Sequence, residues 1–147
     1  MAGHSGGEDE LLLIRQYGVL AYREADNGDP RLLLITSRET RRWVVPRGNP
    51  IFGLPPHLSA AREAWEEAGI VGVVAPKPLG TYRYIKRRND GSEVRAKVYV
   101  FPLEVDVEEE EWPERMERER RWFSLEEAEA LVQEPELKTL IRKFRLD

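Results

Sequence analysis

Short apolar runs separated by turn-forming residues recur along the chain, a pattern typical of a β-rich domain with few helices. Residues 11–23 alternate in their second half and residues 31–36 read RLLLIT, so both predict strands, joined by a turn at Asn27-Gly28. Further strands are expected at residues 43–45, 70–74, 80–87, 93–103 and 120–123, with a second hairpin turn at residues 88–92.

Helices are predicted at three places. Residues 60–70, AAREAWEEAGI, form a helix that ends at Gly69 and presents a small-residue face of alanines to the sheet. Residues 124–127, SLEE, are a capping box, which opens a helix that turns Leu125, Ala128, Leu131 and Val132 inward. A last helix is expected around Leu137, Leu140, Ile141 and Phe144. The elements predict an α/β (α+β) fold, a sandwich around a mixed sheet.

Length and composition favour a single domain over residues 11–147, preceded by a small polar segment at residues 1–10 that we expect to be disordered. No apolar run approaches the roughly 20 residues of a membrane helix, and residues 1–10 do not resemble a signal peptide, so a cytoplasmic protein without a membrane partner is expected. The absence of cysteine excludes disulfides, zinc-thiolate sites and thiol nucleophiles. With two histidines, any metal is expected to be held by oxygen.

Charge is distributed unevenly, although the net charge of −4 argues against a general nucleic-acid binder. Six basic residues lie between Arg83 and Lys97, whereas the segment from Glu104 to Glu111 carries six acids and no base. A locally basic surface on an acidic protein suits a small polyanion. A solvated hairpin of mixed charge accounts for the basic stretch equally well.

The helix at residues 60–70 contains a stripe of three glutamates, Glu63, Glu66 and Glu67, at helical spacing i, i+3 and i+4. Like charges at this spacing repel, and Glu66 and Glu67 also lie near the negative end of the helix dipole. Such a stripe can coordinate Mg²⁺ or Mn²⁺, which prefer carboxylate oxygens. Arg62 can orient a carboxylate or offset its charge; the alternative is a solvated face with an Arg62–Glu66 pair.

This helix and the loop before it resemble the Nudix box, the signature of the Nudix hydrolases. The match runs from Gly48 through position 54 to residues 62–70, REAWEEAGI, and covers eight of the nine specified positions. The departure is Leu54, where the family has a glutamate. The resemblance implies a Nudix-type α/β/α sandwich in which Glu63, Glu66, Glu67 and the carbonyl of Gly48 bind Mg²⁺ or Mn²⁺.

The resemblance also implies the catalytic roles. We expect Glu67 to be the general base, with Glu63 or an acid within Glu108–Glu114 as alternatives, and Arg62 to support the box. The flanks at residues 36–48 and 118–132 are similar to those of the diphosphoinositol polyphosphate phosphohydrolases, and residues 17–145 align with the family as a whole.

The function implied is a metal-dependent pyrophosphohydrolase that cleaves a phosphoanhydride of a small polyphosphorylated substrate, either a diphosphoinositol polyphosphate or a dinucleoside polyphosphate. Two alternatives stay open. One is pyrophosphate removal from an RNA 5′ end, and the other is a binding module that does not cleave its nucleotide or inositol phosphate because Leu54 replaces the box glutamate.

Four arginines are the candidate substrate-binding cations, since the guanidinium group suits bidentate contact with phosphate. They are Arg23, Arg38, Arg47 and Arg118. Three of them also fit roles that involve no substrate: Arg23 as a solvated strand end, Arg38 as a loop solubiliser, and Arg118 as a counter-charge to the glutamate-rich segment.

Overall fold

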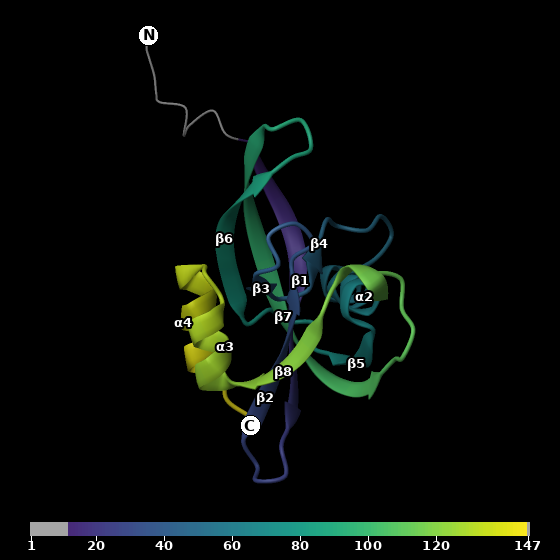
Figure 1. The fold of residues 1–147 in the computed structure, drawn as a ribbon, viewed down its shortest axis with the longest axis vertical. Coiled ribbons are helices and arrows are strands. Elements are labelled where there is room, and N and C mark those ends of the chain that lie inside the picture. The colour runs from purple at the N-terminus through teal and green to yellow at the C-terminus, as the bar shows by residue number, and fades with distance from the viewer. Residues whose placement is uncertain (1–11, 147) are drawn as a thin grey trace.

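The computed structural model describes residues 12–146, which form one mixed sheet with helices on both of its faces (Figure 1). The strands are β1 (Leu13–Glu24), β2 (Pro30–Thr36), β3 (Trp43–Val44), β4 (Arg47–Gly48), β5 (Ile70–Val74), β6 (Gly80–Arg87), β7 (Glu93–Glu108) and β8 (Arg120–Ser124). The helices are α2 (Pro56–Ala68), the 3-10 helix η1 (Arg115–Glu117), α3 (Leu125–Leu131) and α4 (Pro135–Lys143).

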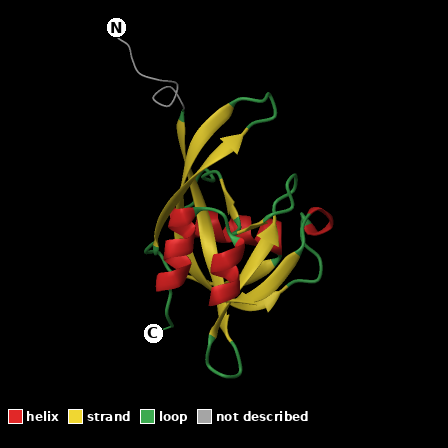
Figure 2. Cartoon of the chain, turned by 60° about the vertical axis from the view of Figure 1, so that its left-hand side comes forward, coloured by secondary structure: helices red, strands yellow, loops and turns green. Residues whose placement is uncertain are grey.

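The centre of the sheet is the parallel pair β1 and β7, in register from Leu13 opposite Arg95 to Tyr22 opposite Glu104. The strand order is β3-β2-β1-β7-β5, while β4 pairs with β1, β6 with β7 and β8 with β2. The β1–β2 and β6–β7 hairpin turns project from opposite ends of the sheet (Figure 2). All pairs other than β1 with β7 are antiparallel within the described residues.

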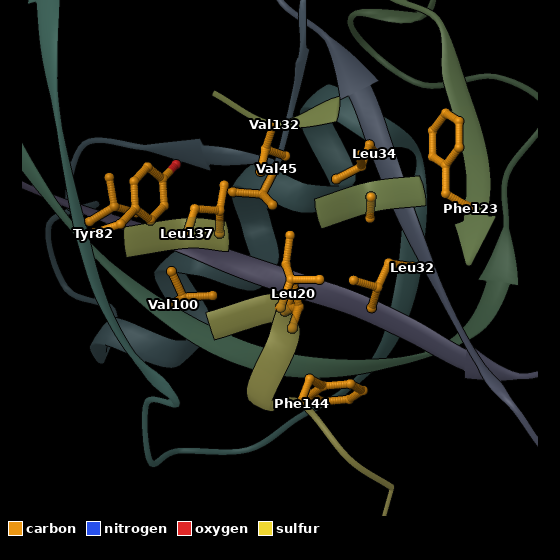
Figure 3. Close-up of a cluster of buried hydrophobic side chains, with 13 residues drawn as sticks. Leu20, Leu32, Leu34, Val45, Tyr82, Val100, Phe123, Val132, Leu137 and Phe144 are labelled. Atoms are coloured by element: carbon orange, nitrogen blue, oxygen red, sulfur yellow. The ribbon is translucent and has the colours of Figure 1, made fainter. Parts of the chain in front are cut away.

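Two apolar cores lie on the two faces of the sheet because alternate residues of β1, β2 and β7 point in opposite directions. One core packs Leu20, Leu32, Leu34 and Val100 against Leu137 and neighbouring residues of α3 and α4 (Figure 3). The other packs Val19, Leu33 and Phe101 against the alanines of α2. The expected α/β/α sandwich with a mixed sheet is confirmed.

Most predicted elements are present, with differences in detail. The proline- and glycine-rich segment between residues 46 and 56, for which no strand is predicted, contains the short strand β4, because Tyr17 and Gly18 of β1 pair with Gly48 and Arg47. Strand β7, predicted over residues 93–103, continues to Glu108, into the acidic stretch from Glu104 to Glu111. Leu131 was expected to point inward but is exposed, since α3 ends at that residue.

The capping box is confirmed: Ser124 accepts a hydrogen bond from the backbone N–H of Glu127, whose side chain accepts one from the backbone of Ser124. The predicted disordered segment at residues 1–10 lies outside the described residues. Among the described helices, none combines the length and apolarity needed to cross a membrane. The cytoplasmic location stays a prediction.

Candidate functional site

Helix α2 carries the predicted carboxylates and is fixed on the sheet by its small residues. It begins at Pro56, after the N-cap residue Pro55, and proline is well tolerated at this position because the first helical N–H has no partner in the helix. Ala60, Ala64 and Ala68 are completely buried against the sheet. This close packing places the flank of the helix that carries Glu63 and Glu67 beside β4.

A cleft of about 670 Å³ opens beside this flank, between α2, the loop at residues 37–42 and the β6–β7 hairpin. Gly48, Glu63 and Glu67 line the cleft. Glu114 joins them from residues 109–114, the acidic segment that follows β7. Glu66 and Arg62 do not line it; they form an exposed pair at 4.0 Å on the outer side of the helix. The structure therefore brings two of the three box glutamates into the cleft and leaves the third at the outer side of α2.

Glu63 lies against the box glycine. A Cβ atom at Gly48 would overlap the Glu63 carboxylate, so any larger residue would displace the Glu63 side chain from this place. Partial burial, together with the charges of Glu66 and Glu114, raises the pKa of Glu63 to about 7 from its ordinary 4.5. The fit between glycine and carboxylate forms one corner of the cleft.

Glu67 is buried and is held by two donors. Its Oε1 accepts a hydrogen bond from the backbone N–H of Arg47 at 3.1 Å, and its Oε2 lies 3.6 Å from the guanidinium of Arg118. Burial raises the pKa of Glu67 to about 7, although Arg118 and the Arg47 N–H act in the opposite direction. The negative charge of the Glu67 carboxylate is therefore only partly compensated.

The acidic segment after β7 is docked on the C-terminal end of α2 and is not a free loop. Consecutive carbonyls at the helix end each accept a hydrogen bond from it: Glu66 from the backbone N–H of Glu114 at 3.0 Å, and Glu67 from Trp112 Nε1 at 3.1 Å. Arg120 donates to the carbonyl of Ala68 at 2.8 Å and stacks on Trp112 at 4.0 Å. This docking fixes Glu114 at the cleft.

Gly69 ends the helix in the left-handed conformation, with φ of 67°. Its carbonyl accepts a hydrogen bond from the backbone N–H of Glu109 at 2.7 Å. A Cβ atom on Gly69 would come within 2.5 Å of the Trp112 ring, so glycine is required here both by conformation and by the approach of the indole. The box glycine at the helix end is thus part of the dock for the acidic segment.

Cations form much of the rest of the cleft, on the loop at residues 37–42 and on the hairpin. Arg47 stacks on the Tyr84 ring at 4.0 Å and donates to the hydroxyl of Tyr82 at 3.2 Å, which fixes its guanidinium at the base of the cleft. Arg38 also lines the cleft but is exposed and pairs with Glu117 at 3.0 Å. The other basic residues in the lining are Arg42, Lys86, Arg87, Arg88 and Arg118.

The remaining two predicted substrate-binding arginines differ in their placement. Arg118 lines the cleft, but its side chain lies between the carboxylates, with Nε 2.7 Å from Glu114 and a donor 3.2 Å from the carbonyl of Thr36. Arg23 lies outside the cleft lining, where it pairs with Glu108 at 3.1 Å and stacks on Trp122 at 4.2 Å. The structure therefore groups Arg38, Arg47 and Arg118 and separates Arg23 from them.

Several residues of the cleft are not individually predicted by the sequence. Lys86, Arg87 and Arg88 belong to the basic stretch that the charge distribution indicates, so the signal is present but is not resolved into positions. Arg42 follows five other polar or charged residues in a loop and carries no signal of its own. Gln16 is buried in the cleft lining, where it accepts from Tyr84 at 2.7 Å and donates to Asn49 at 3.1 Å.

Divalent metal binding can be tested against these donors. Within residues 12–146, no three carboxylate or imidazole side chains are arranged closely enough to hold a metal ion as they stand. The chemistry of the donors nevertheless suits a hard cation, since Glu63, Glu67 and Glu114 present oxygen and Gly48 leaves a gap that Glu63 occupies. The residues present fit a divalent ion that would draw these carboxylates together.

Leu54, the departure from the box pattern, lies in the loop before α2. Its backbone N–H donates to the carbonyl of Ile51 at 3.1 Å, and the backbone N–H of Ile51 in turn donates to the Ser59 hydroxyl at 3.0 Å. These bonds hold the loop without an acidic side chain at position 54. Leu54 is not among the residues that line the cleft.

Comparison with known proteins agrees with the fold and the box. Nudix hydrolase 12, mitochondrial, of Arabidopsis thaliana is 34% identical over 119 residues, covering 77% of this chain and 57% of that protein. Diphosphoinositol polyphosphate phosphohydrolase 3-alpha of Mus musculus is 32% identical over 111 residues, covering 74% of this chain and 63% of that protein. The chain thus spans about three fifths of the length of these curated relatives.

Among solved structures, the crystal structure of the C. elegans Ap4A hydrolase superposes with a TM-score of 0.64 at 21% identity, covering 90% of this chain and 96% of that chain. At this identity the likeness concerns the fold alone. The family model of the NUDIX domain matches residues 7–144. The predicted resemblance is confirmed, and the chain belongs to the Nudix family.

Proposed function

We propose that this domain hydrolyses a phosphoanhydride bond of a small, highly phosphorylated molecule with the help of Mg²⁺ or Mn²⁺. The observation that carries the proposal is the composition of one cleft: Glu63, Glu67 and Glu114 gather at α2, and Arg42, Arg47 and the hairpin cations line the rest. Carboxylates suit a metal and arginines suit phosphate, so the two sets together suit a metal-bound polyphosphate.

Each side chain has a separate task in this proposal. When bound, the metal supplies positive charge that neutralises the phosphoryl oxygens and the carboxylates around it. Glu67 accepts the proton of the attacking water, and its hydrogen bond from the Arg47 N–H fixes the direction of the carboxylate. Glu114, held at the cleft by its own backbone N–H, is the alternative proton acceptor. Arg47 and Arg38 hold the phosphates that do not react.

The proposed substrates are diphosphoinositol polyphosphates or dinucleoside polyphosphates. Two facts support this class: the curated relatives include a protein named as a diphosphoinositol polyphosphate phosphohydrolase, and the cleft contains more cations than a single diphosphate requires. Arg118, which lies between Glu67 and Glu114, is suited to release one carboxylate and contact a phosphate when a metal is present.

A phosphate-release screen tests the proposal, with diphosphoinositol, dinucleoside polyphosphate, nucleoside triphosphate, sugar nucleotide and 5′-triphosphorylated RNA substrates, each with Mg²⁺, Mn²⁺ or EDTA. We expect turnover that EDTA abolishes and that falls at least about a hundredfold in Glu67→Gln. Glu126→Gln, an exposed acid on α3, is the matched control and should keep the parent rate. Unchanged turnover in Glu67→Gln would contradict the site assignment.

A second candidate, a Nudix domain that binds such a molecule without cleaving it, is favoured by Leu54 and by the lack of a preformed three-carboxylate group among residues 12–146. Ligand-induced thermal stabilisation with no phosphate release under any metal would support this candidate. Metal-dependent release of phosphate from any substrate in the screen would exclude it.

A further inference from the structure

Arg42 lies at the cleft with its backbone already fixed. The loop at residues 37–42 is closed on itself, since the Ser37 N–H donates to the Arg42 carbonyl at 2.8 Å and the Arg42 N–H donates to the Ser37 hydroxyl at 3.2 Å. The side chain then reaches toward the start of α4, where its guanidinium donates to Glu134 at 2.9 Å, and it keeps 24% of its surface exposed. Arg42 is one of the residues that line the cleft.

Glu134 is an unusual partner because it is almost completely buried, with 6% of its side chain exposed. Its Oε2 accepts from Arg42, while its Oε1 is buried without a hydrogen-bond partner in the described part of the chain. A carboxylate in such a place is costly unless a cation compensates it. Although Glu134 is the N-cap residue of α4, its side chain makes no capping hydrogen bond, so the helix start does not account for the acid.

The charge of Glu134 also acts on the base of the cleft. Burial lowers the pKa of Arg47, but Tyr82, Tyr84 and Glu134 together raise it above its ordinary value. Glu134 is thus a negative charge behind two arginines that both line the cleft, one in direct contact and one at longer range. A neutral side chain would fill the same space without compensating these cations.

We propose that Arg42 is a substrate-phosphate contact and that Glu134 is its positioning residue. Glu134 takes one of the five N–H donors of the guanidinium and fixes the direction of the others, so that the exposed donors face the cleft before the anion arrives. The subsite takes a phosphoryl group other than the one held at α2. That the ligand is a substrate rests on the proposed function. Binding of a polyphosphate at this subsite does not depend on hydrolysis.

This subsite favours substrates that carry extra phosphates beyond the scissile bond. Glu63 and Glu67 line the cleft from α2, whereas Arg42 lines it from the loop at residues 37–42, with Glu134 behind it. A ligand must be long or densely phosphorylated to engage both. Arg42 is therefore a determinant of the preference for polyphosphorylated molecules over simple diphosphates.

The test measures binding of inorganic tripolyphosphate by isothermal titration calorimetry in EDTA, without turnover. We expect Arg42→Ala to weaken the Kd about tenfold and Glu134→Ala about fivefold, because an unpositioned guanidinium still carries its charge. The double variant should bind no more weakly than Arg42→Ala alone, since Glu134 acts through Arg42. Arg142→Ala, which removes an arginine paired with Glu129 at 2.6 Å outside the cleft, is the matched control and should stay within about twofold of the parent.

Glu134→Gln separates positioning from folding. The amide keeps an oxygen that can accept from Arg42, so this variant should lose clearly less affinity than Glu134→Ala, and near-parent thermal unfolding would show that it folds. An unchanged Kd in Arg42→Ala overturns the subsite. If the Kd changes of Arg42→Ala and Glu134→Ala multiply in the double variant, the positioning role is overturned. An equal loss of affinity in Glu134→Gln and Glu134→Ala also overturns it. A parent that binds tripolyphosphate but releases no phosphate from any substrate refutes the proposed hydrolysis and leaves this subsite standing.

Discussion

Replacing Glu67 with glutamine should stabilise the metal-free fold while removing activity. Burial holds the pKa of this carboxyl at about 7 in the folded state against 4.5 for an ordinary glutamate. Because the pKa is raised in the folded state, the folded protein disfavours the ionised form of Glu67. The stability that the protonated carboxyl contributes is fully present below pH 4.5 and is lost as the pH rises through about 7. Glutamine has no charge to lose or gain.

The size of the effect follows from the two pKa values. The difference between about 7 and 4.5 corresponds to about 3 kcal/mol at pH 8, where the carboxyl is ionised in both states. At pH 5 the folded carboxyl is mostly protonated, and the same calculation leaves about 1 kcal/mol. Glu67→Gln should therefore exceed the parent in unfolding free energy by about 3 kcal/mol at pH 8 and by about 1 kcal/mol at pH 5.

Urea denaturation in EDTA at the two pH values measures this difference directly. Glu66→Gln makes the same chemical change one residue earlier on the same helix, but its side chain is 37% exposed and lies outside the cleft lining, so its effect should be small at both pH values. Adding Mg²⁺ should stabilise the parent and not Glu67→Gln. An equal stability difference at pH 5 and pH 8, or a less stable Glu67→Gln at pH 8, would refute the reasoning.

Three further substitutions test separate parts of the site. Gly48→Ala should weaken Mn²⁺ binding about tenfold by calorimetry, because the new methyl overlaps the Glu63 carboxylate; an unchanged affinity would mean that Glu63 is not a ligand. Leu54→Glu should raise phosphate release severalfold by restoring the loop acid, and an unaltered rate would show that this acid does not limit turnover. Arg120→Ala removes buried donors to helix carbonyls and should lower the urea unfolding free energy by about 2 kcal/mol, whereas the exposed Arg121→Ala should change it by less than about 0.5 kcal/mol.

Local patterns are sufficient to predict most of the fold. Strand β6 has the bounds that the sequence predicts, and the capping box at Ser124 specifies the start of α3. These features depend on neighbouring residues, so periodicity and capping chemistry reveal them. Strand β4 escapes prediction because its two residues pair with Tyr17 and Gly18, some thirty positions earlier, and proline and glycine around it indicate only irregular structure.

The site is predictable where a motif is contiguous and not where it depends on distant contacts. Glu63 and Glu67 follow from the box, but Glu114 is only one of several acids in a range, because its place is set by a backbone hydrogen bond to α2. Arg42 and Glu134 meet across 92 positions of sequence, and although Arg42 lies in the flank at residues 36–48, no local pattern pairs it with Glu134. Arg23 lies near the end of β1 and outside the cleft lining, where it pairs with Glu108, so its phosphate contact stays a prediction.

The acidic stripe on α2 violates two rules of helix electrostatics, and the structure resolves only one of the conflicts. The negative helix end is compensated, since Glu109 and Glu114 backbone N–H groups, Trp112 and Arg120 occupy the last carbonyls. The carboxylates themselves are not compensated, because burial, and after it the charges of neighbouring carboxylates, keeps the pKa values of Glu63 and Glu67 raised even with Arg118 beside them. A fold that directs so many donors to the helix end and leaves the carboxylates short of positive charge supports the proposal that a divalent cation from solution completes the electrostatic balance.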